Sequence, residues 1–130
     1  MDRAADRILV VDDEPALLKM LSMYLRRMGY TVVTSTSPEE AWNAFLEATD
    51  DFSLAVLDGS MAGARKDDLA GRLLQASPRL CAIVSSGYPW DMTAIEAVAP
   101  GRAIFLQKPY TSEMLKAAVR GLLAAQEKQV

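Results

Sequence analysis

Short apolar runs alternate five times along the chain with segments of helical periodicity. The runs are of strand length and rich in Val, Ile and Leu, at residues 7–11, 31–35, 54–58, 80–85 and 103–107. Most of them lack the alternation of polar with apolar residues that a half-exposed strand shows, which is typical of strands covered on both faces. The pattern therefore predicts a sheet that lies between two layers of helices.

The intervening segments place their apolar residues on one stripe, as helices packed on a sheet do. Clear stripes run through residues 17–28 and 41–48, and a long helix is expected over about 111–126. The shortest helix is expected within residues 91–99. Five strand–helix units in succession predict a parallel sheet with right-handed crossovers and helices on both of its faces.

Local signals mark two of the helix boundaries. The segment "SPEE" places Ser37 as N-cap, Pro38 at the first helical position and Glu40 at the third, which is a capping box with the preferred proline. Gly29 suits the left-handed residue that follows a helix. These signals fix where the second helix begins and where the first one ends.

Length and composition agree with one domain. With 130 residues that are 51% hydrophobic, residues 1–130 are expected to form a single α/β domain whose core spans about 7–124. The net charge of −3 argues against non-specific binding to nucleic acid or to anionic membranes. Cys81 is the single cysteine, and no apolar stretch approaches the roughly 20 residues that span a bilayer. A cytoplasmic protein is expected.

The chain contains no histidine. This absence excludes Ser-His-Asp and Cys-His catalysis, histidine-ligated zinc, and any phosphohistidine carried by the chain itself. Any chemistry must therefore use carboxylates, hydroxyls and lysine.

Several of these groups follow strands of the predicted sheet. Asp12 and Asp13 come directly after the first strand, Asp58 ends the third, Ser85 ends the fourth and Lys108 follows the fifth. In open parallel sheets, ligands bind outside the carboxyl ends of the strands. Carboxylates crowded there repel one another unless a cation joins them, and purely oxygen ligands favour Mg²⁺ or Mn²⁺ over zinc.

A carboxylate at such an edge can attack a phosphoryl group and form an aspartyl phosphate, with a metal and a lysine neutralising the phosphoryl oxygens. Asp58 is the candidate nucleophile because it stands between apolar Leu57 and Gly59. Two acids after a strand could instead serve only as a helix N-cap. The coincidence with Ser85 and Lys108 at other strand ends favours the chemical interpretation.

Four segments carry a resemblance to a known family: "VVDDEP", "LAVLDGSM", "IVSSGY" and "FLQKPY". Over about residues 8–123 the chain resembles the receiver domain of bacterial two-component response regulators. The segments "SSGYPW" and "FLQKPYTSEML" look more like the receivers attached to hybrid histidine kinases than like those of transcription factors. The resemblance implies a flavodoxin-like (βα)5 three-layer sandwich with a five-stranded parallel sheet in the order 2-1-3-4-5.

The resemblance also implies a set of roles for the acidic residues. Asp58 would accept a phosphoryl group from the phosphohistidine of a sensor histidine kinase or histidine phosphotransfer protein. Asp13 and Asp58 would bind Mg²⁺ (or Mn²⁺) directly, with the backbone carbonyl of Ser60 as a third ligand. Asp12 would act on the metal largely through water.

Further roles follow for the residues on the later strands. Lys108 would contact the phosphoryl group and Ser85 would hydrogen-bond it, while Phe105 would turn inward as the switch aromatic. The peptide bond between Lys108 and Pro109 is typically cis in the family. Three other interpretations stay open: a solvated Lys108, Ser86 in place of Ser85, and plain core packing of Phe105.

The loop after Asp58 departs from the family pattern. Receivers commonly have proline four residues after the phosphoacceptor and glycine four further on, whereas this chain has Ala62 and Lys66. A different loop shape there would alter phosphoryl access or lifetime.

The expected output is a shift between two conformers, read by a protein partner at the face of the fourth helix, fifth strand and fifth helix. No nucleic-acid or membrane partner is expected, and a homodimer stays open. The chain stops soon after its last helix, so we expect a single-domain regulator or an excised module. Apart from self-phosphorylation and autodephosphorylation, no enzymatic activity is expected.

Three rival functions are weighed against this one. An unphosphorylated receiver-like module that binds a partner constitutively stays open because of the unusual loop. An Asp-nucleophile phosphatase of the haloacid dehalogenase type would need an acid at position 60, where this chain has Ser60. A flavin binder is disfavoured because the acids after the first strand would repel the phosphate of the cofactor.

Overall fold

The computed structural model describes residues 6–60 and 69–127, in which five strands alternate with five helices. The strands are β1 (Arg7–Val11), β2 (Thr31–Ser35), β3 (Phe52–Asp58), β4 (Cys81–Ser86) and β5 (Ala103–Gln107). The helices are α1 (Pro15–Arg27), α2 (Pro38–Glu47), α3 (Leu69–Ala76), α4 (Thr93–Val98) and α5 (Ser112–Glu127). This alternation confirms the predicted α/β class.

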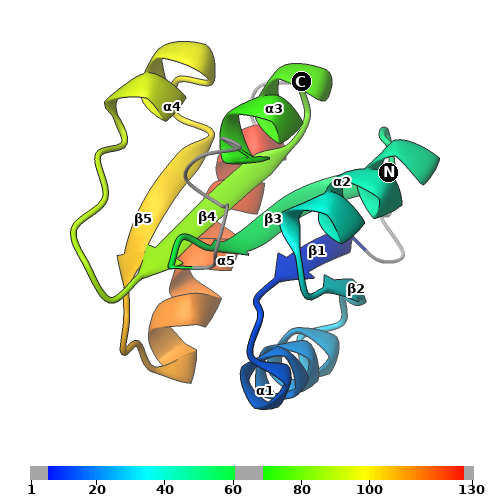
Figure 1. The fold of residues 1–130 in the computed structure, drawn as a ribbon, viewed down its shortest axis with the longest axis vertical. Helices are drawn as coiled ribbons and strands as arrows, with labels where there is room; N and C mark the ends of the chain where they lie inside the picture. The colour runs from blue at the N-terminus through cyan, green and yellow to red at the C-terminus, as the bar shows by residue number, and fades with distance from the viewer. Residues whose placement is uncertain (1–5, 61–68, 128–130) are drawn as a thin grey trace.

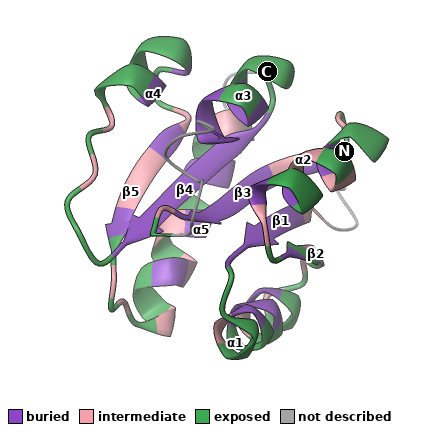
Figure 2. Cartoon of the chain, in the orientation of Figure 1, coloured by how far each residue is buried: buried purple, intermediate pink, exposed green. Residues whose placement is uncertain are grey.

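The five strands form one sheet in the order β2-β1-β3-β4-β5, and each neighbouring pair is parallel. All carboxyl ends therefore lie at the same edge, as the arrowheads in Figure 1 show. The expected flavodoxin-like order is confirmed. The central strands β1, β3 and β4 are almost wholly buried, whereas β2 at the edge contains exposed and half-buried residues as well as buried ones (Figure 2).

The sheet separates two apolar cores. One face packs against α2, α3 and α4, with Phe45, Leu73 and Ile95 among its buried side chains. The other face packs against α1 and α5, where Leu25 and Leu115 are fully buried. The strands contribute alternate residues to the two sides because successive side chains of a strand point to opposite faces. The result is a three-layer sandwich.

The element boundaries follow the sequence signals with small differences. β3 begins at Phe52, two residues earlier than predicted, because Phe52 packs with Phe45 while polar Ser53 interrupts the apolar run and bonds Asp6 (Oγ to Oδ1, 2.8 Å). β4 runs one residue later than the apolar pattern indicates, through Ser86.

The predicted caps are largely confirmed. The Ser37 hydroxyl accepts the Glu40 amide at 3.1 Å, as an N-cap does. The Glu40 carboxylate, however, returns to the amide and hydroxyl of Thr36, one residue before the position that a standard capping box uses. Gly29 follows α1 with a φ of +100°, a left-handed conformation that glycine adopts without steric cost.

Arg102 ties the end of α3 to the loop that precedes β4. Its guanidinium donates to three backbone carbonyls, those of Leu74 (3.1 Å), Ser77 (2.9 Å) and Leu80 (3.0 Å). The last carbonyls of a helix have no partner within the helix, so an arginine fork can satisfy several of them together.

Arg102→Ala is therefore expected to lower the free energy of unfolding by about 2 kcal/mol, because three carbonyls lose a charged donor. Arg102→Lys should recover only part of the loss, since an ammonium is a point donor that lacks the planar fork. Urea unfolding measures both values. Arg79→Ala, at an exposed position of the same loop, is the control and should change stability by less than about 0.5 kcal/mol. Equal losses at the two positions would contradict the capping role.

Candidate functional site

Polar side chains from four strands meet at the carboxyl edge of the sheet. Asp12 follows β1, Asp58 is the last residue of β3, and Lys108 follows β5. Ser85 lies in β4 directly opposite Asp58 in the ladder. Asp12 and Asp58 are buried, with 2% and 5% of their surfaces exposed. The buried strands that precede Asp12 and Asp58 fix the backbone of both residues at the carboxyl edge of the sheet.

Lys108 joins two of the acids. Its Nζ lies 3.1 Å from Oδ1 of Asp58 and 3.4 Å from Oδ2 of Asp12. Its backbone amide donates to the Ser86 carbonyl at 2.9 Å, which fixes the start of the side chain relative to β4. The peptide bond to Pro109 is cis, as the family resemblance implied. The interpretation of Lys108 as an ordinary solvated lysine is wrong, because its ammonium contacts both buried acids.

Asp13 completes a cluster of three carboxylates. One oxygen from each of Asp12, Asp13 and Asp58 lies within 4.8 Å of the other two, and Asp13 is the exposed member. Three carboxylates and one ammonium leave a formal charge of −2. Hard oxygen donors at this spacing fit a divalent cation such as Mg²⁺, which neutralises that excess. The donor set does not suit zinc, which takes mainly nitrogen and sulfur ligands.

The electrostatic balance of the cluster is reflected in two pKa values. Burial raises the pKa of Asp12 above its ordinary value; the charge of Asp58 adds to the rise, while the Glu14 amide and Lys108 oppose it. Burial alone would lower the pKa of Lys108, but the hydrogen bond to Asp58 and the charges of both acids raise it. Lys108 therefore stays charged, whereas Asp12 lacks enough cationic support to offset its burial.

The turn after Asp58 is held by backbone hydrogen bonds. The Ser60 amide donates to Oδ1 of Asp58 at 2.9 Å, and the Gly59 amide donates to the Ser85 carbonyl at 2.7 Å. The first bond closes a local turn of the kind that aspartate favours. Together they fix the Asp58 carboxylate against β4, with the backbone of Ser60 beside it.

Ser85 and Ser86 are both buried but differ in their partners. The Ser86 hydroxyl is within 3.3 Å of the Ser60 hydroxyl and accepts the Tyr88 amide at 3.1 Å. The Ser85 hydroxyl lies near the Tyr110 phenol yet makes no hydrogen bond of normal geometry among the described residues. A buried hydroxyl without a partner costs about 1 to 3 kcal/mol. Ser85 is therefore the serine with a donor to spare beside Asp58.

Tyr110 lies at the same site, two residues after Lys108. Burial, with a contribution from the charges of Asp12 and Asp58, raises the pKa of Tyr110 to about 12, and the Ser85 hydroxyl opposes the rise. The phenol therefore stays protonated at neutral pH. The sequence analysis gives Tyr110 no chemical role, so its position beside the acidic cluster is a finding of the structure.

Trp90, in the segment between β4 and α4, lies over the backbone of Gly59. A Cβ atom added at Gly59 would come within 2.5 Å of the Trp90 ring, closer than such atoms approach in proteins. Glycine next to Asp58 is therefore required by the close approach of the indole. The contact joins residues 31 positions apart, and no local sequence pattern signals it.

Gly59→Ala is expected to displace the Trp90 ring and to destabilise the fold by about 1 to 3 kcal/mol, as overpacking does. The same change in a Trp90→Ala background should cost much less, because the obstructing ring is gone. Urea unfolding of the four proteins gives the coupling energy. Gly87→Ala is the control, since an added Cβ there meets nothing within 4 Å. A coupling energy near zero would contradict the contact.

Phe105 is half-buried on β5 beside Val84 and belongs to neither apolar core. Plain core packing therefore does not describe its position.

Ala62 and Lys66, where the loop departs from the family pattern, lie outside the described residues. Among the residues on which the chemical prediction rests, Asp12, Asp13, Asp58, Ser60, Ser85 and Lys108 all lie at one edge of the sheet.

A doubly wound parallel sheet with an acidic cluster and a lysine at its carboxyl edge is the arrangement that the resemblance to receiver domains implied. The sequence model of the response regulator receiver domain matches residues 8–120, and the chain belongs to this family. Receiver domains act in two-component signalling, where they are phosphorylated on an aspartate and bind Mg²⁺ at an acidic pocket; they are not classical enzymes. Membership in the family favours phosphorelay signalling over the rival functions.

Two curated relatives show how the chain compares with longer proteins. It is 35% identical over 103 residues to the DNA-binding transcriptional regulator NtrC of Rhizobium meliloti, covering 79% of this chain and 21% of the relative. It is 29% identical over 127 residues to the DNA-binding response regulator MtrA of Mycolicibacterium smegmatis, covering 98% and 54%. The chain thus spans about a fifth to a half of these relatives. Both bear DNA-binding names, so the absence of a nucleic-acid partner stays a prediction.

Solved structures agree with the fold. A receiver domain protein from Clostridium thermocellum superposes with a TM-score of 0.83 at 23% identity, over 95% of this chain and 98% of the other. A CheY-like receiver from Methanospirillum hungatei superposes with a TM-score of 0.78 at 27% identity, over 97% of this chain and 99% of the other.

In residues 6–60 and 69–127, the helices lack the combination of length and apolar character that a bilayer crossing requires.

Proposed function

We propose that Asp58 accepts a phosphoryl group from the phosphohistidine of a sensor histidine kinase or histidine phosphotransfer protein. The P–N bond to the donor imidazole breaks and a P–O bond to the Asp58 carboxylate forms. The observation that carries the proposal is the position of Lys108, whose ammonium lies 3.1 Å from Asp58. A fixed cation at that oxygen stabilises the charge of an incoming phosphoryl group without reorganisation.

The acidic cluster would hold Mg²⁺ or Mn²⁺, with Asp13, Asp58 and the backbone carbonyl of Ser60 as direct ligands and Asp12 acting through water. The bound metal supplies neutralisation of the phosphoryl oxygens. The protein supplies the rest: Lys108 holds the Asp58 carboxylate in place, and the Ser60 amide fixes its orientation at 2.9 Å. The residual charge of the cluster supports this assignment.

Ser85 would donate its unused hydroxyl to the phosphoryl group, and Phe105 would then turn inward beside it. Ser85 is buried without a hydrogen bond, so the new contact satisfies a group that is otherwise unpaired. Phe105 is half-buried and belongs to neither apolar core. We expect the two conformers to differ at the face of α4, β5 and α5, where a protein partner would read the change.

We further propose that residues 1–130 act as one domain in the cytoplasm, and that this domain is a receiver of the kind attached to hybrid histidine kinases. The likeness of "SSGYPW" and "FLQKPYTSEML" to hybrid-kinase receivers supports the second point. Copurification of the chain with a phosphotransfer protein, followed by radiolabelled phosphoryl transfer between the two, tests it.

Incubation with acetyl phosphate and Mg²⁺ tests the proposed chemistry. The intact mass should increase by one phosphoryl group, and EDTA should prevent the increase. An unchanged mass, together with partner binding that needs no phosphate, would favour the constitutive module. Sustained turnover of a phosphomonoester would favour the phosphatase instead.

A further inference from the structure

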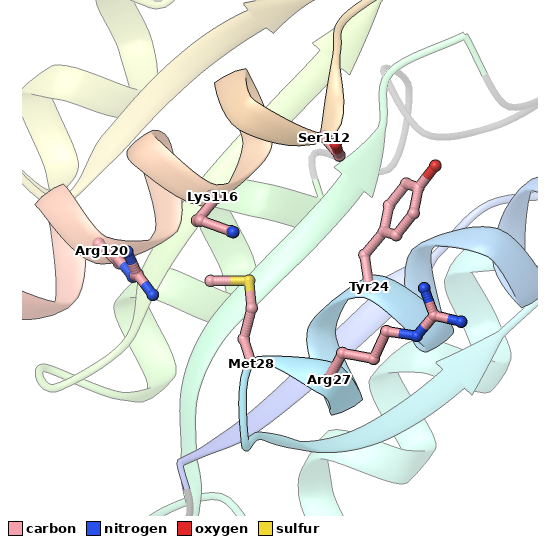
Figure 3. A pocket seen from close by; sticks show the side chains of 6 residues that line it. All are labelled: Tyr24, Arg27, Met28, Ser112, Lys116 and Arg120. Atoms are coloured by element: carbon pink, nitrogen blue, oxygen red, sulfur yellow. The ribbon is translucent and has the colours of Figure 1, made fainter.

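A groove of about 280 Å³ lies between α1 and α5, on the side of the sheet away from α2 and α3. Residues from both helices line it: Tyr24, Arg27, Met28, Ser112, Lys116 and Arg120. Figure 3 shows the Lys116 ammonium and the Met28 thioether directed toward one another across the groove. None of these residues belongs to the acidic cluster, so the groove is a separate feature.

The groove concentrates positive charge on an acidic protein. Arg27, Lys116 and Arg120 all line it, although the chain carries a net charge of −3. In the part of the chain that the structure describes, none of the three makes an ion pair with an acid. The nearby Glu113 carboxylate accepts a hydrogen bond from the Ser112 hydroxyl at 3.1 Å and does not line the groove. The cations are therefore available to an external anion.

The spacing of the cations restricts what the groove can hold. Lys116 and Arg120 lie one turn apart on α5, which places their Cβ atoms about 5 to 6 Å from each other. Arg27 stands on the opposite wall, on α1. Met28 is half-buried against the α1–α5 core and supplies an apolar base. The groove therefore presents Lys116 and Arg120 in a row on one wall, Arg27 on the other wall, and the apolar side chain of Met28 between the helices. The three positive charges do not surround a single point.

We propose that this groove docks an acidic helical segment of a partner protein. Two carboxylates one helical turn apart would face Lys116 and Arg120, a third acid would reach Arg27, and an apolar side chain would rest on Met28. A second copy of the chain is disfavoured because a two-fold contact would bring identical cations together. A nucleotide is disfavoured because the cations are divided between two helices, with Arg27 on α1 and Lys116 and Arg120 on α5, and do not gather around one phosphate position.

The docking is independent of phosphorylation and can be tested on the unmodified protein. The probe is an alanine-rich helical peptide that carries glutamates one turn apart and a leucine on the same face. We expect it to bind with an affinity that falls as salt rises, and to shift the amide NMR signals of Met28, Lys116 and Arg120. The double variant Lys116→Glu/Arg120→Glu should lose at least about tenfold in affinity.

Two further measurements separate a specific groove from general charge. The variant Lys19→Glu/Arg79→Glu makes the same change in net charge at exposed positions outside the groove, and should bind the peptide as the wild type does. A matched peptide with lysines in place of glutamates should bind Lys116→Glu/Arg120→Glu and not the wild type. Circular dichroism checks that both double variants remain folded.

Several results would overturn the proposal. Equal losses in the two double variants would mean that only net charge matters. Tighter binding of pyrophosphate or of phosphatidylserine vesicles at these residues would assign the groove to a phosphate ligand or to a membrane. Self-association that the charge reversal abolishes would assign it to a second copy of the chain.

Discussion

Asp58→Asn is expected to abolish phosphoryl uptake from acetyl phosphate. The amide that replaces the carboxylate is a poor nucleophile, and no other acid of the cluster has the same surroundings: Asp58 alone is held by both Lys108 and the Ser60 amide. Intact-mass spectrometry should show one added phosphoryl group on the wild type and none on the variant. The fold should survive, because asparagine has nearly the same shape and Lys108 keeps Asp12 as an ionic partner.

The matched control is Asp51→Asn, which removes an acid from an exposed turn before β3 and leaves the cluster intact. Its uptake of phosphoryl groups should equal that of the wild type. Uptake by Asp58→Asn at the wild-type rate would mean that another residue is the acceptor. Peptide mapping of the phosphorylated product would then locate that residue.

Lys108→Met is expected to slow phosphorylation by about 10²- to 10³-fold, as the loss of one preorganised charge donor does in other sites. The long apolar side chain preserves most of the packing of the lysine stem. Affinity for Mg²⁺ should not fall, since the change removes a positive charge that repels the metal from Asp12 and Asp58. Stopped-flow rates with acetyl phosphate and a Mg²⁺ titration separate the two effects.

The control for Lys108 is Lys19→Met, an exposed lysine of α1 that lines no part of the acidic edge. It should phosphorylate at the wild-type rate. A parallel fall in rate and in Mg²⁺ affinity for Lys108→Met would indicate that the cluster had collapsed. An unchanged rate would remove Lys108 from the chemistry altogether.

The sheet and the location of the site follow from local patterns in the sequence. Each of β1, β3 and β4 contains an apolar run that is followed directly by a polar residue of the site, so the carboxyl edge could be placed without coordinates. The strand order came from the family resemblance, because apolar periodicity does not determine which strands are neighbours. Ser53 shows the limit of the pattern: a polar residue inside β3 displaced the predicted start of the strand.

Other features depend on contacts between distant segments and leave no local signal. Trp90 meets Gly59 across 31 residues, and Arg102 reaches carbonyls on both sides of the end of α3. The choice between Ser85 and Ser86 depends on which face of β4 each hydroxyl occupies, and an error of one residue in the strand boundary inverts that answer. Only the three-dimensional arrangement distinguishes the unpaired hydroxyl from the paired one.

Because the sheet divides the interior into two cores, substitutions in one core are expected to leave the packing of the other core unchanged. Phe45 on one side of the sheet and Leu25 on the other share no packing neighbours, because the strands stand between them. Stability effects at such separated positions add independently. One helical layer can thus be remodelled for a new binding specificity while the opposite layer, and the loops that it anchors, keep their geometry. A designer could exploit this by re-engineering α1 and α5 without touching α2 or α3.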